Sequence, residues 1–256
     1  MFGKDNKTNN ENKRGLGEMF CTEETINHEE GVIDACGNMY AHAKIMSKNE
    51  TPYIIEKGVL IIPKGETLVK NLNRLVIKEG VERIANEAFY SYKKLKTVVF
   101  PKSLLSIGKL SFGCSGLRSV VIPDGVISVE DAAFSMCDEL KLLTCSGSLH
   151  KIGNGAFERC WRLGSVKLSD HLTTIGSQSF YGCRRLRTLQ LPDSLESIGD
   201  RAFAGCGFRK IVIPKSIITI GDNAFNCSSL VEATVPISIT NVGYDVFPTR
   251  TKIIRI

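Results

Sequence analysis

A chain of 256 residues is long enough for one large domain or two small ones, and 43% hydrophobic and 23% charged residues are ordinary for a globular protein. No apolar run approaches the roughly 18 residues that a membrane-spanning helix needs, and the nine cysteines are an odd number, which argues against a disulfide scaffold. The net charge of +6 is uneven: residues 71–256 carry 24 Lys and Arg against 16 Asp and Glu, whereas residues 1–70 carry 9 against 11. The second part of the chain is therefore the basic part.

The N-terminal stretch MFGKDNKTNNENKRG is polar and has no apolar h-region, so the sequence indicates no secretory signal. We expect residues 1–15 to be a disordered tail. Residues 16–70 are expected to form an N-terminal capping region, in which residues 16–50 have weak helical potential. As written, the chain is expected in the cytoplasm; the alternatives are surface display and export by an unconventional route.

A phenylalanine recurs every 22 or 23 residues, eight times in all, and each lies 17 residues after an apolar residue that opens its unit. The stretch from this opening residue to the Phe has a constant length, and only the turn that joins two units varies by one residue. This is typical of stacked coils, because the stacked segments must keep their register. The phenylalanines are Phe89, Phe112, Phe134, Phe157, Phe180, Phe203, Phe225 and Phe247. The opening residues, or openers, are Leu72, Leu95, Leu117, Leu140, Leu163, Leu186, Phe208 and Leu230.

Each position within a unit predicts a local structure. Apolar residues three and five places after the opener, such as Val120 and Ile122, have the period of a short strand with one buried face. Pro follows in five units and ends the strand. Two further apolar positions, such as Leu195 and Ile198, then lead to a Gly in six units, where a corner needs positive φ or close backbone approach.

A good helix N-cap follows that corner in six of the eight units. Its side chain is expected to accept a hydrogen bond from a backbone N–H two or three residues further on. A single helical or 3₁₀ turn is therefore predicted on the convex side, with its Phe pointing inward. The six residues are Asn86, Asp131, Asn154, Ser177, Asp200 and Asp222.

Units such as LRTLQLPDSLESIGDRAFAGC and LRSVVIPDGVISVEDAAFSMC resemble the bacterial-type leucine-rich repeats of the BspA-like family, over about residues 72–247. The resemblance implies a leucine-rich-repeat solenoid: a β-rich, curved, right-handed coil with short parallel strands on its concave face, used in adhesion or protein recognition. Residues 71–256 would then hold eight units and a C-terminal strand stub at Ile253 and Ile256. Tyr53–Pro63, YIIEKGVLIIP, is similar to the hairpin-like leader found before such arrays.

Six cysteines follow their Phe by two or three residues: Cys114, Cys137, Cys160, Cys183, Cys206 and Cys227. They allow a metal site or cross-coil disulfides, but no CxxC pair occurs, and we favour buried thiols that act as small apolar residues. Cys145, at a core strand position, receives the same interpretation. Cys21, His28, Cys36 and His42 are spaced too loosely for a metal site.

No nucleophile elbow, zinc-binding HExxH, phosphate loop or dinucleotide fingerprint is present, so we expect no enzyme, no cofactor and no metal. His150 and His171 fall on turns and are expected to be solvated.

The predicted concave face is the first candidate for a binding surface, and Val99, Val121 and Leu142 on neighbouring units are expected to form an exposed apolar patch there. The alternative is that β-branched residues merely suit strands. The candidate partner-binding residues on this face are Val99, Val121, Leu142, Thr144, Lys167, Gln190 and Val212.

A basic column just after the openers is the second candidate, and it could dock an acidic protein surface or nucleic-acid phosphates. The alternative is a solvated rim. The rim candidates are Lys96, Arg118, Lys141, Trp161, Arg162, Arg184, Arg185, Arg187, Arg209 and Lys210.

The leading hypothesis is a non-enzymatic module that binds a protein through the concave sheet and the basic rim. In the cytoplasm it would be an effector or inhibitor, and on a cell surface an adhesin-like protein. The alternative is an electrostatic binder of nucleic acid or another polyanion, whose affinity would fall steeply with salt.

Overall fold

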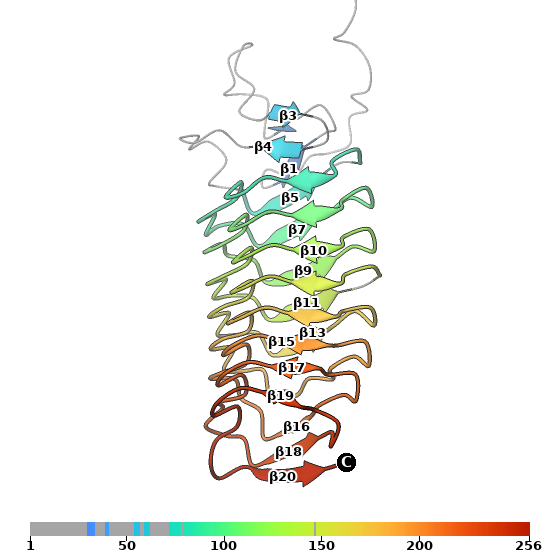
Figure 1. The fold of residues 1–256 in the computed structure, drawn as a ribbon. Helices are drawn as coiled ribbons and strands as arrows, with labels where there is room; N and C mark the ends of the chain where they lie inside the picture. Colours follow the sequence, from blue (N-terminus) through green and yellow to red (C-terminus); the bar gives the residue numbers. More distant parts are fainter. Residues whose placement is uncertain are drawn as a thin grey trace, which may run out of the picture.

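The protein is a column of stacked coils in which each repeat makes one turn (Figure 1). The structure, a computed structural model, describes the backbones of four N-terminal strands and then residues 72–77, 79–145 and 147–256. The coils are numbered here from 1 to 8, each beginning at its opener, from Leu72 to Leu230. This β-solenoid of about eight turns with parallel strands confirms the predicted leucine-rich-repeat fold.

The first sheet contains the strands predicted from the alternating apolar residues three and five places after each opener. Its strands are parallel, and those that pair between neighbouring coils are in register, so that Leu143 of coil 4 lies between Val120 and Val166. The strands are β5 (Arg74–Ile77), β7 (Thr97–Val99), β9 (Ser119–Ile122), β11 (Leu142–Cys145), β13 (Ser165–Lys167), β16 (Lys210–Val212), β18 (Glu232–Val235) and β20 (Lys252–Arg255). The sheet is not continuous: β5–β7, β9–β11–β13 and β16–β18–β20 are separate pieces.

The second of the two apolar positions after the Pro turn, such as Ile198, lies in a second parallel sheet, which runs the length of the column, whereas the first, such as Leu195, precedes the strand. Each coil adds two residues to this sheet, and in coils 1 to 7 the second of them is buried, as Val129 is. The strands are β6 (Arg83–Ile84), β8 (Ser106–Ile107), β10 (Ser128–Val129), β12 (Lys151–Ile152), β14 (Thr174–Ile175), β15 (Ser197–Ile198), β17 (Thr219–Ile220) and β19 (Asn241–Val242). Two residues are too few to show an alternating pattern in the sequence.

The N-terminal strands extend both sheets beyond coil 1. β1 (Glu30–Ile33) pairs in parallel with β5 and antiparallel with β2 (Met39–Tyr40). β3 (Ile54–Glu56) and β4 (Val59–Ile61) form an antiparallel pair, and β4 continues the second sheet through β6. In residues 16–50, where weak helix was expected, the described backbone is therefore strand. The predicted tail at 1–15 lies outside the described residues.

The convex side differs from the prediction, because no helix occurs in the part of the chain that the structure describes. Each coil has instead a run of tight turns, with positive φ two residues before its Phe, as at Gln178 (φ 56°) and Arg201 (φ 52°). Backbone N–H groups then bond alternately within the coil and to the next coil. In coil 5, Phe180 donates to Ala202 O of coil 6 at 2.8 Å, whereas Tyr181 donates to Gln178 O at 3.0 Å. A helix would keep all these bonds local; the stack uses half of them to join coils.

The residues predicted to be helix N-caps do accept backbone N–H groups, but the donor lies in the next coil. Asn154 Oδ1 accepts from the N–H of Ser177 at 2.8 Å, and Ser177 Oγ accepts from the N–H of Asp200 at 3.2 Å. The adjoining glycines are required by this close approach: a Cβ on Gly199 would lie 2.4 Å from Ser177 N. The predicted partner was wrong because a neighbouring coil lies as near as the next turn of the same coil.

The core is a spine of stacked rings flanked by thiols. Successive phenylalanines have ring centroids 5.0–5.6 Å apart and lie nearly parallel, and the pair Phe134–Phe157 is at 5.3 Å and 0°. Next to it, the Cys160 thiol donates to Phe134 O at 3.2 Å and the Cys183 thiol donates to Phe157 O at 3.3 Å. The seven cysteines among the described residues are free, and all but the half-buried Cys114 are buried. The structure thus supports the interpretation of the column as buried thiols.

Candidate functional site

The outward side chains of the first sheet form what we call the strand face, the face predicted to be concave. The three apolar residues proposed as a patch are exposed: Val99 by 40%, Val121 by 56% and Leu142 by 41%. Val121 lies opposite Thr144 on the next strand, and Leu142 lies opposite Ser119, so Val121 and Leu142 are diagonal neighbours. Of the other candidates on this face, Lys167, Gln190 and Val212 are exposed and Thr144 is half-buried.

Part of the basic rim is already paired within the protein. Arg162 forms an ion pair with Glu139 at 2.9 Å, and Lys210 forms one with Glu232 at 2.9 Å. The guanidinium of Arg184 lies 4.5 Å from the centre of the Trp161 ring, which is a cation–π contact that covers one face of that ring. These three basic side chains are therefore less available to a partner than their exposure suggests.

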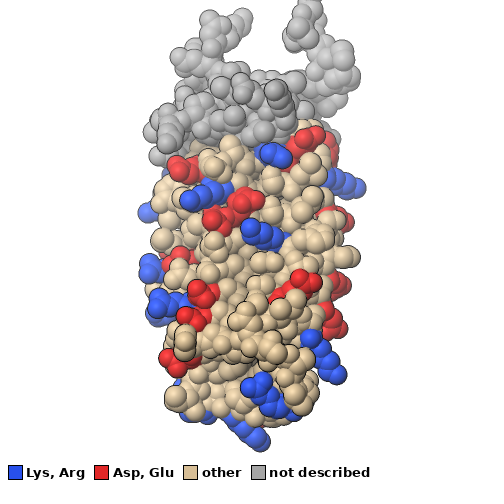
Figure 2. All heavy atoms as spheres, viewed as in Figure 1, with Lys and Arg blue, Asp and Glu red and all other residues tan. Residues whose placement is uncertain are grey.

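The remaining rim residues are free to act as isolated charges. Arg185, Arg187 and Arg209 are exposed, and no described acidic side chain forms an ion pair with them. Arg118 and Lys141 also form no ion pair with the described residues, whereas Lys96 is half-buried and donates through Nζ to Lys93 O at 3.1 Å. The face in Figure 2 shows Lys and Arg interspersed with Asp and Glu. Arg187 and Arg209 thus place positive charge that no described acidic side chain neutralises on the neighbouring coils 6 and 7.

The strand face is interrupted at coil 6. Elsewhere the residue after an opener donates to its counterpart one coil earlier, as Lys141 N does to Arg118 O at 2.9 Å and Val231 N to Arg209 O at 2.9 Å. The equivalent bonds on both sides of Arg187 are missing, and residues 188–190 form no strand. Within the described chain, the backbone groups of Thr188, Leu189 and Gln190 have no hydrogen-bond partner.

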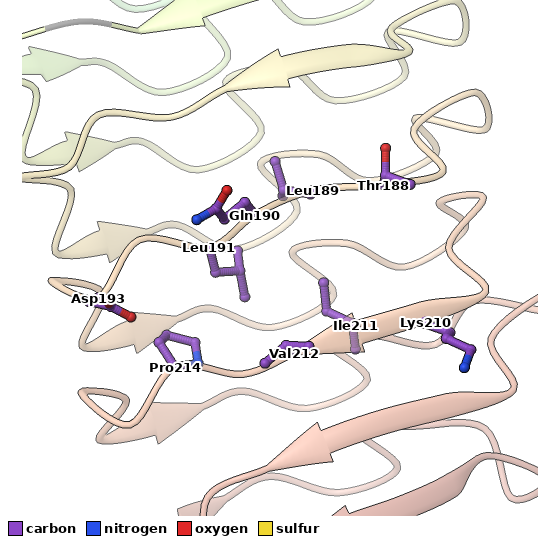
Figure 3. Close-up of a pocket in the computed structure, with 9 residues that line it drawn as sticks. All are labelled: Thr188, Leu189, Gln190, Leu191, Asp193, Lys210, Ile211, Val212 and Pro214. Atoms are coloured by element: carbon purple, nitrogen blue, oxygen red, sulfur yellow. The ribbon is translucent and has the colours of Figure 1, made fainter.

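A hollow of about 410 Å³ opens at this interruption, between coils 6 and 7 (Figure 3). Leu191 and Ile211 point into the space between the two segments, Lys210 lies at one end and Asp193 lies at the other. The hollow is lined by Thr188, Leu189, Gln190, Leu191, Asp193, Lys210, Ile211, Val212 and Pro214. Of these, the sequence predicted Gln190, Val212 and Lys210 as partner-binding residues and Thr188 as part of the same face, but it did not predict Leu189, Leu191, Asp193, Ile211 or Pro214.

Both breaks in the first sheet coincide with a phenylalanine outside the spine. Phe208 is the one opener that is not Leu, and it packs edge-on against Phe203 at 5.8 Å. Phe100, in coil 2, occupies a strand position and packs edge-on against Phe112 at 5.6 Å, next to the break between β7 and β9. A ring takes more space along the stack than an aliphatic side chain, so we attribute both breaks to these rings. Phe208 is the feature of the sequence from which the break beside the hollow could have been predicted.

Outside the strand face, the described residues offer little reactive chemistry. No group of three or more His, Cys, Asp or Glu is placed there to hold a metal ion. His150 and His171 are exposed, with ring centroids 6.2 Å apart. The Nδ1 atom of His150 contacts the backbone carbonyl of Ser148, and that of His171 contacts the backbone carbonyl of Gly147.

Burial raises the pKa of the Cys145 and Cys227 thiols to about 12, so these thiols are protonated and unreactive near neutral pH. His28, His42, Cys21 and Cys36 lie outside the described residues. Nor does the described chain include a helix of the length and apolar character that crossing a bilayer requires.

Comparison with known structures supports the fold. A leucine-rich repeat protein from Bacteroides ovatus ATCC 8483 is 22% identical, with a TM-score of 0.62 over 86% of this chain and 66% of that one. The match therefore spans just under two thirds of the B. ovatus protein. The T. pallidum leucine-rich repeat protein TpLRR is 25% identical, with a TM-score of 0.51 over 78% of this chain and 86% of that one.

Family models give the assignment directly. No curated protein matches this chain at a significant level. The model of the BspA type leucine-rich repeat region matches six copies, over residues 67–178 and 150–256, and so covers well over half of the chain. The chain belongs to the BspA type leucine-rich repeat family.

Proposed function

We propose that this protein is a non-enzymatic binding module that recognises a partner protein through its strand face and the basic rim beside it. The observation that carries the proposal is the combination, on one face, of exposed apolar side chains with unpaired arginines. Val121 on β9 and Val212 on β16 are 56% and 61% exposed. Arg209 directly precedes β16, and Arg185 and Arg187 precede the equivalent segment of coil 6. Exposed apolar residues that are rimmed by charge are typical of protein interfaces.

Two features favour a protein over a nucleic acid as the partner. Trp161 is the one tryptophan of the chain, and Arg184 already covers one face of its ring, so it is a poor platform for stacking bases. The acidic residues Glu139 and Glu232 neutralise two of the rim cations, which weakens the field that would attract phosphates.

Affinity capture from a lysate of the source organism tests this proposal. The baits are the wild type, a rim variant (Arg184, Arg185, Arg187 and Arg209 each changed to Glu) and a control variant. The control reverses the same number of exposed charges elsewhere: Lys109, Lys151, Arg201 and Lys215 to Glu. The expected result is a discrete protein that the wild type and the control retain, that nuclease does not release and that the rim variant loses.

Two other results contradict the proposal. Nuclease-sensitive material whose capture falls steeply between 0.05 and 0.2 M salt, about a thousandfold for six or more phosphate contacts, would establish a polyanion binder. Substrate turnover by the purified protein that a single substitution abolishes would establish an enzyme.

A further inference from the structure

We propose that the hollow between coils 6 and 7 is the subsite where the strand face holds an extended segment of the partner protein, one that places an apolar side chain next to an Asp or Glu. This inference rests on the proposed function and names the chemistry of what is bound. Three independent features of this place support it: unpaired backbone groups, an apolar hollow and unpaired arginines.

The backbone groups come first. Thr188, Leu189 and Gln190 run beside β16 without forming a strand (Figure 3), and their N–H and C=O groups have no partner among the described residues. The ladder of strand hydrogen bonds is intact from coil 3 to coil 5 and again from coil 7 onward. Thr188 and Gln190 are exposed and Leu189 is half-buried, so this segment is open to solvent in the free protein. Unpaired strand-like backbone is what extended peptides bind in proteins that recognise them.

The hollow supplies a place for a side chain. Its volume of about 410 Å³ lies within the range of small binding pockets. Leu191 and Ile211 close its base, being 6% and 3% exposed, while Val212 is 61% exposed at its rim. Leu189 is half-buried, although its counterparts Leu143 and Val120 in coils 4 and 3 are fully buried. The aliphatic lining favours a Leu, Ile, Val or Phe side chain over a base or a sugar.

The charges around the hollow determine the second feature of the bound segment, its Asp or Glu. Arg187 directly precedes Thr188 and Arg209 directly precedes Lys210, so two exposed arginines without an ion pair to the described residues adjoin in sequence the end of the hollow where both segments begin. Lys210 is already held by Glu232 at 2.9 Å, and Asp193 lies at the opposite end. A carboxylate on the bound segment would pair with Arg187 or Arg209, and Asp193 would repel a second one at the far end. The site therefore selects a mixed segment, not a uniform polyanion.

A display library of random heptapeptides, selected on the immobilised full chain, tests the inference directly, because the selection requires no identified partner. The expected enriched peptides combine Asp or Glu with Leu, Ile, Val or Phe. An enriched peptide, made synthetically with a fluorophore, is then titrated against four variants and the wild type by fluorescence anisotropy.

The variants form two matched pairs. Val212→Arg lies at the hollow, and Ile218→Arg introduces the same side chain in the same coil, just before β17 of the second sheet, at a residue that is 57% exposed. Arg187→Glu with Arg209→Glu reverses the charges beside the hollow, and Lys109→Glu with Lys151→Glu reverses two exposed charges, one in a turn and one on the second sheet. Both changes at the hollow are expected to weaken binding by about tenfold or more, and both controls by less than about twofold.

Three results would overturn the inference: enrichment of peptides without the acidic–apolar combination, no enrichment at all, or equal losses in the controls. Displacement of the peptide by a fluorescent thymidine oligonucleotide, with tighter binding of the oligonucleotide, would do so as well. The proposed function fails separately, when the lysate yields no discrete protein that the wild type retains and the rim variant loses. A failure of the peptide tests alone excludes this subsite and leaves the module intact.

Discussion

Asn154 Oδ1 accepts a hydrogen bond at 2.8 Å from the backbone N–H of Ser177, which is 23 residues further along the chain and one coil further along the column. The same bond recurs between other neighbouring coils: Asn86 accepts from the N–H of Lys109, and Asp222 accepts from the N–H of Tyr244. Each of these polar side chains accepts a hydrogen bond from a backbone N–H of the next coil. This row of side-chain hydrogen bonds therefore sets the register between repeats.

Asn154→Ala is expected to lower the free energy of unfolding by about 0.5–1.5 kcal/mol, because the Ser177 N–H loses its acceptor. Asn154→Asp keeps an acceptor oxygen and should lie closer to the wild type. Urea denaturation measures both, and hydrogen exchange should show faster exchange of the Ser177 amide in the Ala variant. An unchanged exchange rate at Ser177 would mean that the bond contributes nothing.

Phe157→Ala should cost about 3–5 kcal/mol, because it removes a fully buried ring from the middle of the spine and leaves a cavity. Arg187→Ala, an exposed residue without an ion pair to the described residues, should change stability by less than about 0.5 kcal/mol. Thermal and urea denaturation compare the two. Similar losses of stability in the two variants would show that the buried and exposed positions of the repeat are wrongly assigned.

Ser179 is fully buried in the position before Phe180, and its hydroxyl has no hydrogen-bond partner among the described residues. Most other coils carry Ala at this place. Ser179→Ala is therefore expected to stabilise the protein by up to about 1 kcal/mol.

The matched control for Ser179 is Ser169, which is equally buried but donates to Gly147 O at 2.7 Å and accepts from His171 N at 3.1 Å. Ser169→Ala should instead destabilise by about 1–2 kcal/mol. Urea midpoints that move in the same direction for both variants would contradict the assignment of bonded and unbonded hydroxyls.

The buried thiols predict a loss of stability in alkali. Burial raises the pKa of Cys145 to about 12, above the value near 9 expected in the unfolded chain. The folded state then binds more protons than the unfolded state, so stability is complete below about pH 9 and falls as pH rises toward 12.

Cys145→Val places at this strand position an aliphatic residue like the Ile122 and Leu168 of the neighbouring coils. Between pH 9 and 10.5, the wild type should lose about 1–2 kcal/mol more than this variant, as measured by urea denaturation at each pH. Parallel pH curves for the two proteins would show that Cys145 ionises without penalty in the fold.

The sequence predicted the parts of the fold that depend on spacing along the chain. The constant interval from opener to Phe placed Leu163 and Phe180 in one coil with both side chains inward, and both are fully buried. The thiols and the strand positions followed from the same interval. The cap residue Ser177 also suggested a helical turn around Phe180, and there the prediction was wrong, because bonds to the next coil, such as that from Phe180 to Ala202, replace every second local one.

The hollow could not be predicted in the same way. The segment from Leu186 to Pro192, LRTLQLP, has apolar residues at the same inward positions as LRSVVIP in coil 3, where the strand β9 forms and pairs with β11. What differs is the packing between coils, where Phe208 takes the place of a leucine. Arg187 and Arg209 were proposed from their repeat position, but their proximity to a hollow depends on that break. Their role in binding stays a prediction.

Capture of the partner by two face-specific variants tests the central claim most directly. Val212→Arg alters the strand face at a residue 61% exposed, and Ile218→Arg alters the second sheet of the same coil just before β17, at a residue 57% exposed. If the strand face binds the partner, Val212→Arg loses the captured protein and Ile218→Arg retains it as well as the wild type does. Loss of the partner with Ile218→Arg and retention with Val212→Arg would contradict the account and place the interface on the opposite face.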